Sequence, residues 1–314
     1  LQGKQLILVE DLLSKDGSLH PVQQSMVNYH GSQCGFCTPG FVMSLFSMFK
    51  NYSRYNDNLI KDSISGNLCR CTGYKPIIKA AKSLNNKNKN DQFFKNKKNT
   101  IKLLKKINND TIVIYKKNKK YFAPRYIQEL KKILNKNINS HLLSGGTDLS
   151  LKVTKERKDI ESIIYMNSID ELNYIKNTNN YVEVGATTPL IKFENYIQKY
   201  YLDFKTILQR YGSVQIRNVA TMAGNIATAS PIGDTLPLLL SLDAKLVLKS
   251  IKKTKIVPLN NFFLSYRKTK LKKGQFIESV RIPLFPKNIF KAYKISKRFD
   301  DDISSVCASF NLEV

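Results

Sequence analysis

The sequence predicts an α+β protein in which a helical domain precedes a domain of mixed helices and strands. Three observations indicate this class. Apolar residues follow helical spacing after each of two cysteine pairs within residues 1–84. A Lys/Asn-rich stretch at residues 85–115 then interrupts the apolar pattern. From about Tyr121, helical and strand patterns alternate, as expected for a second domain.

The first domain contains two related cysteine segments. GSQCGFCTPG holds Cys34 and Cys37 in a C-x2-C pattern, and GNLCRCTGYKP holds Cys69 and Cys71 in a C-x-C pattern. Each pair ends in Cys-Thr and is followed within a few residues by Gly, an aromatic residue and Pro. This short repeat predicts two halves related by an approximate two-fold axis.

Both cysteine pairs come directly before predicted helix starts. Thr38 suits an N-cap and Pro39 the first helical position, and Pro76 begins a later helix. Between them, a helix is expected to end at Gly66. Apolar residues at helical spacing predict the buried face after Thr38: Phe41, Val42, Leu45, Phe46 and Phe49. Helix N-termini carry partial positive charge and unpaired N–H groups, which favour thiolates.

The spacing of these cysteines leaves two kinds of metal centre open. A disulfide framework does not suit a lysine-rich chain without a signal peptide. Four thiolates can bind zinc or hold an iron–sulfur cluster, and spacing alone does not separate the two. His30 lies close to Cys34, but we expect a surface or packing role for it. Cys307, in the apolar run VCASF, is expected to be a small core residue.

The formal net charge of +27 permits binding to nucleic acids or anionic surfaces. The lysines are spread along the chain, however, and no nucleic-acid-binding motif accompanies them. We therefore expect no nucleic-acid partner, and we expect residues 85–115 to be a solvated linker. No apolar run approaches the roughly 18 residues that a membrane span needs, so a cytoplasmic protein without a membrane partner is expected.

The second domain contains two glycine-containing turns after predicted strands. The pattern predicts a helix over 122–134, a strand and turn in HLLSGGTDLSL, and a strand in VEVGATTP. A small-residue loop that leads into a helix and a strand is expected over 220–248. Such turns can wrap a phosphate with backbone N–H groups. From the residues alone, a nucleotide site and a purely structural pair of turns both remain open.

The first domain resembles the helical [2Fe–2S] domain of the molybdenum hydroxylases. The resemblance rests on HPVQQSMVNYHGSQCGFCTPGFVMSLF and SGNLCRCTGYKPI. It implies a four-helix fold with pseudo-two-fold symmetry over 1–84, in which four cysteines hold one cluster, two per iron: Cys34, Cys37, Cys69 and Cys71. It also implies that Gln33 faces the molybdopterin of a partner, although Gln33 could instead be a loop residue that fixes the cluster turn.

The second domain resembles the FAD-binding domain of the same family, an α+β fold of the vanillyl-alcohol-oxidase type, here over 116–288. LLSGGTDL and NVATMAGNIATASPIGD carry this resemblance. It implies an FAD diphosphate region and a second FAD segment: Leu142, Leu143, Ser144, Gly145, Gly146, Thr147, Asp148 and Leu149, then Thr221, Gly224, Asn225, Thr228 and Asp234. Tyr211 falls at the position of an aromatic residue beside the flavin ring, with an ordinary core tyrosine as the alternative.

The last segment, FKAYKISKRFDDDISSVCASF, resembles the start of the family's C-terminal flavoprotein domain. We expect residues 289–314 to be a truncated part of that domain. The resemblance implies that Lys294 contacts the flavin and that Asp301 and Asp302 lie near a nicotinamide site. KRFDDD could equally be a charged turn at the surface.

Within the family, the quoted segments are most similar to the small subunits of bacterial xanthine dehydrogenases. This similarity implies electron transfer from molybdenum–molybdopterin on a large partner subunit through [2Fe–2S] to FAD and then to NAD+, during oxidation of hypoxanthine and xanthine to urate. It implies a dimer of heterodimers and places no catalytic residue for hydroxylation in this chain. Hydroxylation of an aldehyde or an aromatic heterocycle, and a zinc-stabilised nucleic-acid-binding module, are the alternatives.

The chain starts at Leu1 within what we expect to be a structural element, LILVEDL. The family's preceding ferredoxin-like domain has a C-x4-C-x2-C signature, which this sequence does not contain. We therefore expect the sequence to be a piece of a longer protein, with a second [2Fe–2S] cluster in a missing N-terminal part.

Overall fold

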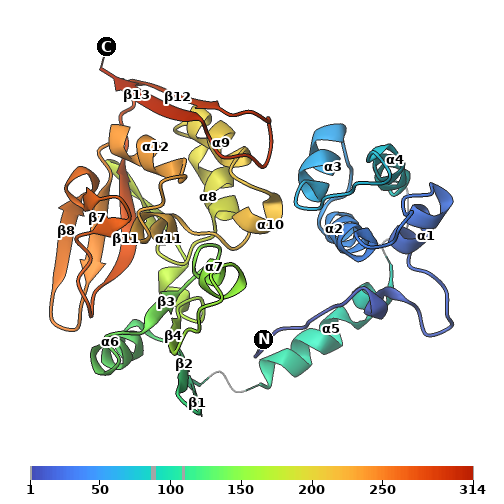
Figure 1. Ribbon diagram of the computed structural model, residues 1–314, viewed down its shortest axis with the longest axis horizontal. Helices are drawn as coiled ribbons and strands as arrows, with labels where there is room; N and C mark the ends of the chain where they lie inside the picture. Colours follow the sequence, from blue (N-terminus) through green and yellow to red (C-terminus); the bar gives the residue numbers. More distant parts are fainter. Residues whose placement is uncertain (1, 86–89, 108–109, 314) are drawn as a thin grey trace. The chain divides into compact units, whose positions relative to one another are not determined.

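The computed structural model describes residues 2–85, 90–107 and 110–313. Contacts between residues divide the chain into two compact units, Leu1–Asn109 and Asp110–Val314. We call them unit 1 and unit 2 and describe each by itself. The α+β class is confirmed, because unit 1 is helical and unit 2 combines helices with sheets (Figure 1).

Unit 1 is built from helices that pack around one apolar core. Its elements are η1 (Glu10–Leu12), α1 (Pro21–Asn28), α2 (Thr38–Asn51), α3 (Asp57–Ile64), α4 (Lys75–Ser83) and α5 (Gln92–Lys105). The expected buried face of α2 is confirmed, since all five of its predicted apolar residues are buried. They pack with η1, α1, α3 and α4 through Leu12, Val22, Ile60 and Ile77. Burial of this apolar surface is the main stabilising contribution to the unit.

The helix starts differ in detail from the predictions. Thr38 is the first residue of α2 and Cys37 occupies the cap position, so Thr38 is not the N-cap. The Thr38 hydroxyl instead pairs with the Ser32 hydroxyl at 2.6 Å. The opening segment LILVEDL was expected to be an element, but it is irregular until the 3₁₀ turn η1.

The expected linker contains a helix, α5, none of whose residues is buried. Asp91 caps this helix by accepting a hydrogen bond from the Phe94 N–H at 2.8 Å. The same carboxylate accepts from Lys50 Nζ at 2.8 Å and contacts His20 Nε2 at 3.1 Å. Residues 86–89 and 108–109 of the expected linker lie outside the described residues. The cap and its two partners tie the start of α5 to the helical core, which lysine-rich composition did not predict.

Unit 2 contains a four-stranded sheet with the order β1-β2-β4-β3 and a five-stranded sheet with the order β5-β6-β11-β7-β8. The first has β1 antiparallel to β2, and β2 and β3 parallel to β4. The second is antiparallel throughout. The strands are β1 (Ile112–Lys116), β2 (Lys119–Ala123), β3 (His141–Leu143), β4 (Ser162–Tyr165), β5 (Ile175–Asn177), β6 (Tyr181–Gly185), β7 (Lys245–Lys249), β8 (Thr254–Pro258) and β11 (Phe276–Pro283).

Helices and two hairpins complete unit 2. The helical segments are α6 (Ile127–Lys136), α7 (Leu149–Thr154), η2 (Asp170–Leu172), α8 (Leu190–Ile197), α9 (Leu202–Gln209), α10 (Val214–Arg217), α11 (Met222–Ala227), α12 (Thr235–Ser241) and η3 (Leu259–Asn261). The hairpins pair β9 (Phe263–Ser265) with β10 (Lys268–Thr269), and β12 (Ile289–Ile295) with β13 (Val306–Leu312). The small-residue loop expected before α12 contains the helix α11, which is a correction to the prediction.

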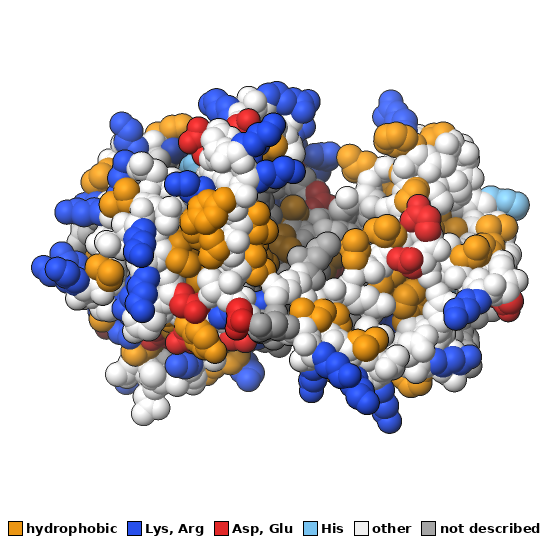
Figure 2. All heavy atoms as spheres, turned by 90° about the horizontal axis from the view of Figure 1, so that it is seen from below, with side chains coloured by type: hydrophobic (Ala, Val, Ile, Leu, Met, Phe, Trp, Pro, Cys, Tyr) orange, Lys and Arg blue, Asp and Glu red, His pale blue; other side chains and the backbone are white. Residues whose placement is uncertain are grey.

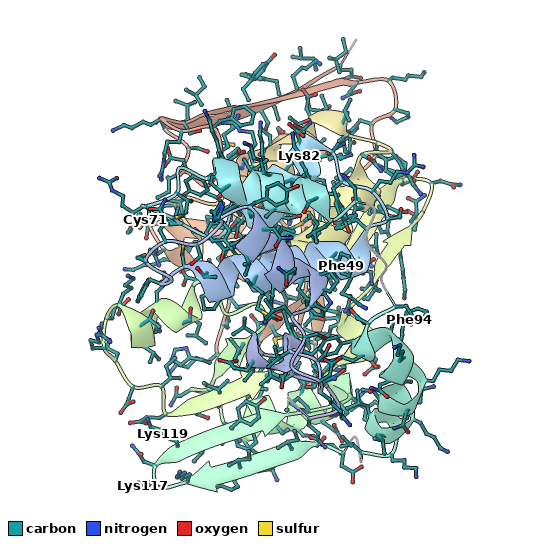
Figure 3. The ribbon with its side chains drawn as sticks, turned by 90° about the vertical axis from the view of Figure 1, so that its right-hand side faces the viewer. Phe49, Cys71, Lys82, Phe94, Lys117 and Lys119 are labelled. Carbon is teal, nitrogen blue, oxygen red and sulfur yellow. The ribbon has the colours of Figure 1, made fainter. Side chains whose placement is uncertain are left out.

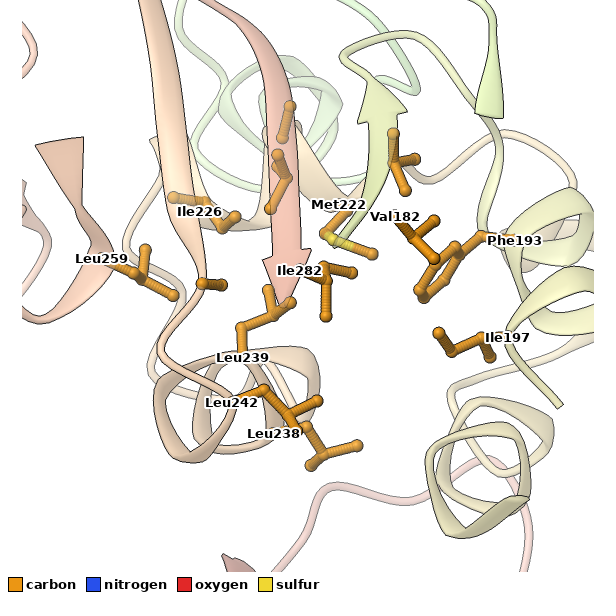
Figure 4. Close-up of a cluster of buried hydrophobic side chains, with 14 of the residues drawn as sticks. Val182, Phe193, Ile197, Met222, Ile226, Leu238, Leu239, Leu242, Leu259 and Ile282 are labelled. Carbon is orange, nitrogen blue, oxygen red and sulfur yellow. The ribbon is translucent and has the colours of Figure 1, made fainter. Parts of the chain in front are cut away.

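The main core of unit 2 lies between the five-stranded sheet and the helices α8, α9, α11 and α12. Val182 of β6 and Ile282 of β11 meet Phe193 of α8 and Met222 of α11 there (Figure 4). Leu238 and Leu239 of α12 join the same cluster. This packing fixes the ends of β6, α9 and α11, between which the site described below lies.

The surface charge is dispersed. On the face that Figure 2 shows, Lys and Arg side chains are scattered among apolar and neutral ones rather than gathered in one patch. Within the part of the chain that the structure describes, no helix combines the length and apolar character needed to cross a membrane.

Candidate functional site

The four cysteines of unit 1 come together at the starts of α2 and α4. The thiol of Cys71 donates to Cys34 Sγ at 3.4 Å, and the side chains of Cys37 and Cys69 share a hydrogen bond. Each pair therefore takes one cysteine from each segment. The donor set suits a [2Fe–2S] cluster, which four cysteine thiolates hold. Within the described residues, no group of three or more His, Cys, Asp or Glu side chains is placed to hold a single metal ion, so the cysteines lie as two pairs rather than as one four-ligand set.

Local hydrogen bonds distinguish the cysteines electrostatically. The Thr72 hydroxyl lies 3.1 Å from Cys69 Sγ, and the Thr72 N–H donates to the same sulfur at 3.4 Å. These bonds lower the pKa of the Cys69 thiol to about 7. Burial, by contrast, raises the pKa of the Cys37 thiol. Thr72 thus favours the thiolate form, which is the form that ligates a metal.

The surroundings of the cysteines are open and apolar. Phe36 is 95% exposed and Leu68 is 80% exposed, although both are large apolar side chains. Gln33 is exposed in the same loop. Cys71 lies at the edge of unit 1, whereas Phe49 lies among its helices (Figure 3). Exposed apolar side chains beside a redox site are typical of a surface that another protein covers.

In unit 2, the structure brings all fifteen residues predicted to contact FAD to one cavity of about 390 Å³. The loop from β3 to α7 forms one wall, and the start of α11 forms another. Asp301 and Asp302, predicted near a nicotinamide, line the same cavity. That these residues contact FAD stays a prediction, but their convergence from four separate segments is a fact of the fold.

The two predicted FAD segments approach each other through Gly145. A Cβ atom at this position would lie 2.2 Å from the Val219 carbonyl oxygen, so only glycine fits. Gly146 has a φ of +75°, which is a conformation that glycine adopts without strain. The glycine pair therefore lets the β3–α7 loop turn against the start of the second segment.

The second segment is fixed by its own polar side chains. The Thr221 hydroxyl caps α11 by accepting from the Gly224 N–H at 3.1 Å. The buried amide of Asn225 accepts a hydrogen bond from the Thr235 hydroxyl at 2.5 Å, which ties α11 to α12. These bonds orient α11 with its N-terminal turn at the cavity.

A buried ion pair closes one side of the cavity. Lys294 Nζ of β12 donates to Asp234 Oδ2 at 2.7 Å and to the Arg210 carbonyl at 2.9 Å. The Ser304 hydroxyl donates to the same aspartate. Cys307, expected in the core, is partly buried, and burial raises the pKa of its thiol to about 12. The β12–β13 hairpin packs on α9 and α12 (Figure 1). Lys294 of this hairpin lines the cavity.

Tyr211 lies in the turn between α9 and α10, where burial and the nearby Asp234 and Asp148 carboxylates raise its pKa to about 12. Its phenol therefore stays protonated at neutral pH.

Sequence reasoning missed the charged residues that surround this turn, Arg210, Glu194 and Arg217. No motif or spacing marked them, because their roles depend on partners brought together by folding.

A second cavity, of about 430 Å³, adjoins the first and shares Ser230, Ile232 and Asp234 with it. Tyr266 and Arg267 line it. Tyr266 is 74% exposed, and Arg267 faces Asp148 across 3.7 Å. Sequence reasoning did not predict this cavity.

Comparison with known proteins matches one protein family to unit 1 and another to unit 2. Residues 8–82 match the [2Fe-2S] binding domain family, and residues 116–285 match the FAD binding domain in molybdopterin dehydrogenase. The xanthine dehydrogenase of Emericella nidulans is 30% identical over 100% of this chain and 27% of its own length. That of Dictyostelium discoideum is 30% identical over 99% of this chain and 28% of its own length. The chain thus spans about a quarter of these relatives.

Solved structures show the same fold at lower identity. Carbon monoxide dehydrogenase from Hydrogenophaga pseudoflava matches with a TM-score of 0.56 and 24% identity, over 61% of this chain and 68% of that one. Quinoline 2-oxidoreductase from Pseudomonas putida 86 matches with a TM-score of 0.58 and 21% identity, over 62% and 68% respectively.

Fold and site together define an iron–sulfur flavoprotein, an oxidoreductase component that carries a [2Fe–2S] cluster and FAD. The match to the FAD-binding family covers more than half of the chain. The chain belongs to the molybdenum hydroxylases, the molybdopterin dehydrogenase family. The zinc-stabilised nucleic-acid-binding alternative is thereby set aside.

Proposed function

We propose that this chain is the electron-transfer part of a xanthine dehydrogenase, which accepts electrons from a molybdenum–molybdopterin site on a large partner subunit and delivers them to NAD+. Bound in the two units, the [2Fe–2S] cluster would supply one-electron transfer and FAD hydride transfer. The observation that carries the proposal is the convergence of four cysteines in unit 1 and of fifteen FAD-motif residues in unit 2. Oxidation of hypoxanthine and xanthine as the driving reaction is supported by relatives that are 30% identical.

The surface around the cysteines supports docking of that partner. Phe36 and Leu68 offer exposed apolar area next to thiols that would otherwise face water. A donor must approach closely for electron transfer, and Gln33 stands beside Cys34 on this surface. We therefore place Gln33 at the contact with the partner's molybdopterin and propose a dimer of heterodimers in the cytoplasm, which the mass of the co-purified complex and cell fractionation would check.

Replacement of Gln33 by Ala is expected to slow electron transfer into the cluster without changing iron content, because its side chain is exposed and has no part in the helical core. Stopped-flow reduction of the complex by substrate measures the rate. Loss of iron from the variant would show that Gln33 stabilises the cluster loop instead.

The second cavity supports NAD+ as the acceptor. It shares residues with the FAD cavity, and Arg267 provides positive charge suited to a diphosphate. Exposed Tyr266 provides an aromatic face suited to a base. An acceptor bound there would lie against the flavin site.

The first test is anaerobic purification of the chain, followed by measurement of iron, zinc and released flavin. Iron near two per chain, a rhombic EPR signal after reduction, and bound FAD are expected. Zinc without iron or flavin would overturn the proposal.

Anaerobic addition of NADH then tests the acceptor. Bleaching of the flavin absorbance is expected, and Arg267→Ala should require more NADH for the same bleaching. If NADH leaves a fully loaded flavin oxidised, the acceptor is not NAD+, and a molybdenum hydroxylase of another substrate class becomes the better description.

A further inference from the structure

A buried ion pair lies beneath the turn that carries Tyr211. Arg217 of α10 is 1% exposed and Glu194 of α8 is 5% exposed. Arg217 Nε stands 3.2 Å from Glu194 Oε2. Burying two charges costs free energy unless they are paired and hydrogen-bonded. The retention of such a pair inside an otherwise apolar core therefore calls for a structural reason.

The reason lies in the other bonds of Arg217. Its Nη1 donates to the Gln209 carbonyl at 3.1 Å and to the Gly212 carbonyl at 2.8 Å. These two carbonyls bracket Arg210 and Tyr211 in the α9–α10 turn. Gly212 has a φ of +56°, which gives the turn its sharp reversal. One nitrogen of the guanidinium thus bonds both ends of the turn while Nε faces Glu194, an arrangement that a lysine ammonium could reproduce only in part.

The other side of the turn is held by β12. Lys294 Nζ donates to the Arg210 carbonyl, and Arg210 Nη1 donates to the Lys294 carbonyl at 2.9 Å. The turn is therefore bonded from the core side by Arg217 and from the hairpin side by Lys294. Between these attachments, Tyr211 and Gly212 face the FAD cavity.

We propose that Arg217, with Glu194 as its counter-ion, is a positioning residue that sets Tyr211 against the flavin. The inference rests on the proposed contact between Tyr211 and FAD. Arg217 itself does not line the cavity and acts only through the turn. Without Arg217, the turn loses two charged hydrogen bonds, and the Tyr211 side chain becomes conformationally more mobile. Ordering that side chain when FAD binds then costs free energy, which weakens binding.

The test is the double variant Glu194→Leu/Arg217→Met in the whole chain. Replacing both partners by apolar residues leaves no unpaired buried charge, and such double replacements are often tolerated. We expect FAD binding to weaken by about tenfold. We also expect the visible circular dichroism and fluorescence of the bound flavin to change, because the tyrosine beside it moves. Arg217→Lys, which keeps the charge, should restore part of both signals.

Two controls separate positioning from general stability. Arg281→Met removes a salt bridge to Glu183, 2.8 Å long, on the five-stranded sheet and outside the FAD cavity. It should lower the thermal midpoint without altering the flavin spectra. In a double-mutant cycle, Tyr211→Ala should abolish most of the further effect of the Glu194/Arg217 change, since both act through one side chain.

Each outcome is decisive. Additive effects of Tyr211→Ala and the double variant, or unchanged flavin spectra in a double variant that still binds FAD, would overturn the positioning role. If the double variant fails to fold, Glu194→Gln/Arg217→Met, which also removes both charges but keeps a polar side chain at position 194, takes its place in the same cycle. If the unmodified chain binds no FAD, the FAD site itself fails, and this inference fails with it.

Discussion

The two Cys-Thr segments differ in what the threonine hydroxyl contacts. The Thr72 hydroxyl lies beside Cys69 Sγ, whereas the Thr38 hydroxyl pairs with Ser32. Hydrogen bonds to ligand sulfurs stabilise the more negative, reduced cluster and so raise its potential. The similarity of the two segments in sequence therefore hides a difference in chemistry.

Replacement of Thr72 by Val is expected to lower the midpoint potential of the cluster by tens of millivolts, on the order of one hydrogen bond. EPR-monitored redox titration measures the change, with iron content as the check on assembly. Thr38→Val is the matched control and should leave the potential nearly unchanged. Equal shifts in both variants would contradict the assignment to the Thr72–Cys69 bond.

Gly145 gives a second prediction at this scale. Alanine at this position would force backbone apart, because its Cβ would overlap the Val219 carbonyl. We expect Gly145→Ala to cost about 1–3 kcal/mol in unfolding free energy and to weaken FAD binding more than tenfold. Isothermal titration with FAD and thermal unfolding measure the two effects.

Gly274→Ala controls for backbone strain. Gly274 has a φ of +77°, but a Cβ there meets nothing closer than 3.8 Å. This variant should lose some stability and keep FAD affinity. If it loses FAD as strongly as Gly145→Ala does, the close approach of the two segments is not what the cavity requires.

At the scale of elements, helices α1 and α5 meet at one buried polar cluster. His20 Nδ1 accepts from the Val22 N–H at 3.2 Å and caps α1, while Nε2 faces Asp91, the cap of α5. Burial lowers the pKa of His20 below 6.5, although Asp91 partly offsets this effect and Lys50 adds to it. The neutral ring is the form that caps α1, because a protonated Nδ1 cannot accept a hydrogen bond.

This arrangement predicts a pH dependence. The unfolded chain binds a proton at His20 more readily than the folded chain, so unit 1 should lose stability as the pH falls below about 6.5. His20→Asn keeps a capping acceptor and removes the titration, so its stability should be flatter with pH. The thermal midpoint between about pH 8 and about pH 5 tests this. Equal pH profiles for both proteins would contradict it.

At the scale of the whole molecule, two units have separate cores. The apolar core of unit 1 involves η1 and α1–α4, and the clusters of unit 2 involve its own strands and helices. Each cofactor motif lies entirely within one unit. The two cofactor sites should therefore form independently of each other.

Separate expression of residues 1–109 and 110–314 tests this independence. The first piece should hold iron without flavin, and the second should bind FAD without iron. Absorbance and metal content distinguish them. A second piece that binds FAD only when the first is present would show that the flavin site depends on unit 1.

The sequence by itself predicted the α+β class and the order of the two domains, and its resemblance to the molybdenum hydroxylases supplied the segments in which both sites are expected. Cysteine spacing, glycine turns and helical periodicity involve residues that are close together in the sequence, so they can be recognised without the fold. It also predicted the helix after each cysteine pair to within a residue or two. The sequence analysis did not predict α5. Its lysine-rich composition shows little apolar periodicity, and the start of the helix is fixed by contacts of Asp91 with the distant residues His20 and Lys50.

Only the tertiary structure decided how the cysteines pair across their segments, which threonine contacts a sulfur, and what holds Tyr211 in place. Glu194, Arg217 and Lys294 come from three different elements, and their charges are tolerated inside the protein only because folding supplies their partners. A single sequence does not show which residues lie next to these side chains in space. Hydrogen bonds and burial depend on neighbours, and therefore on the fold.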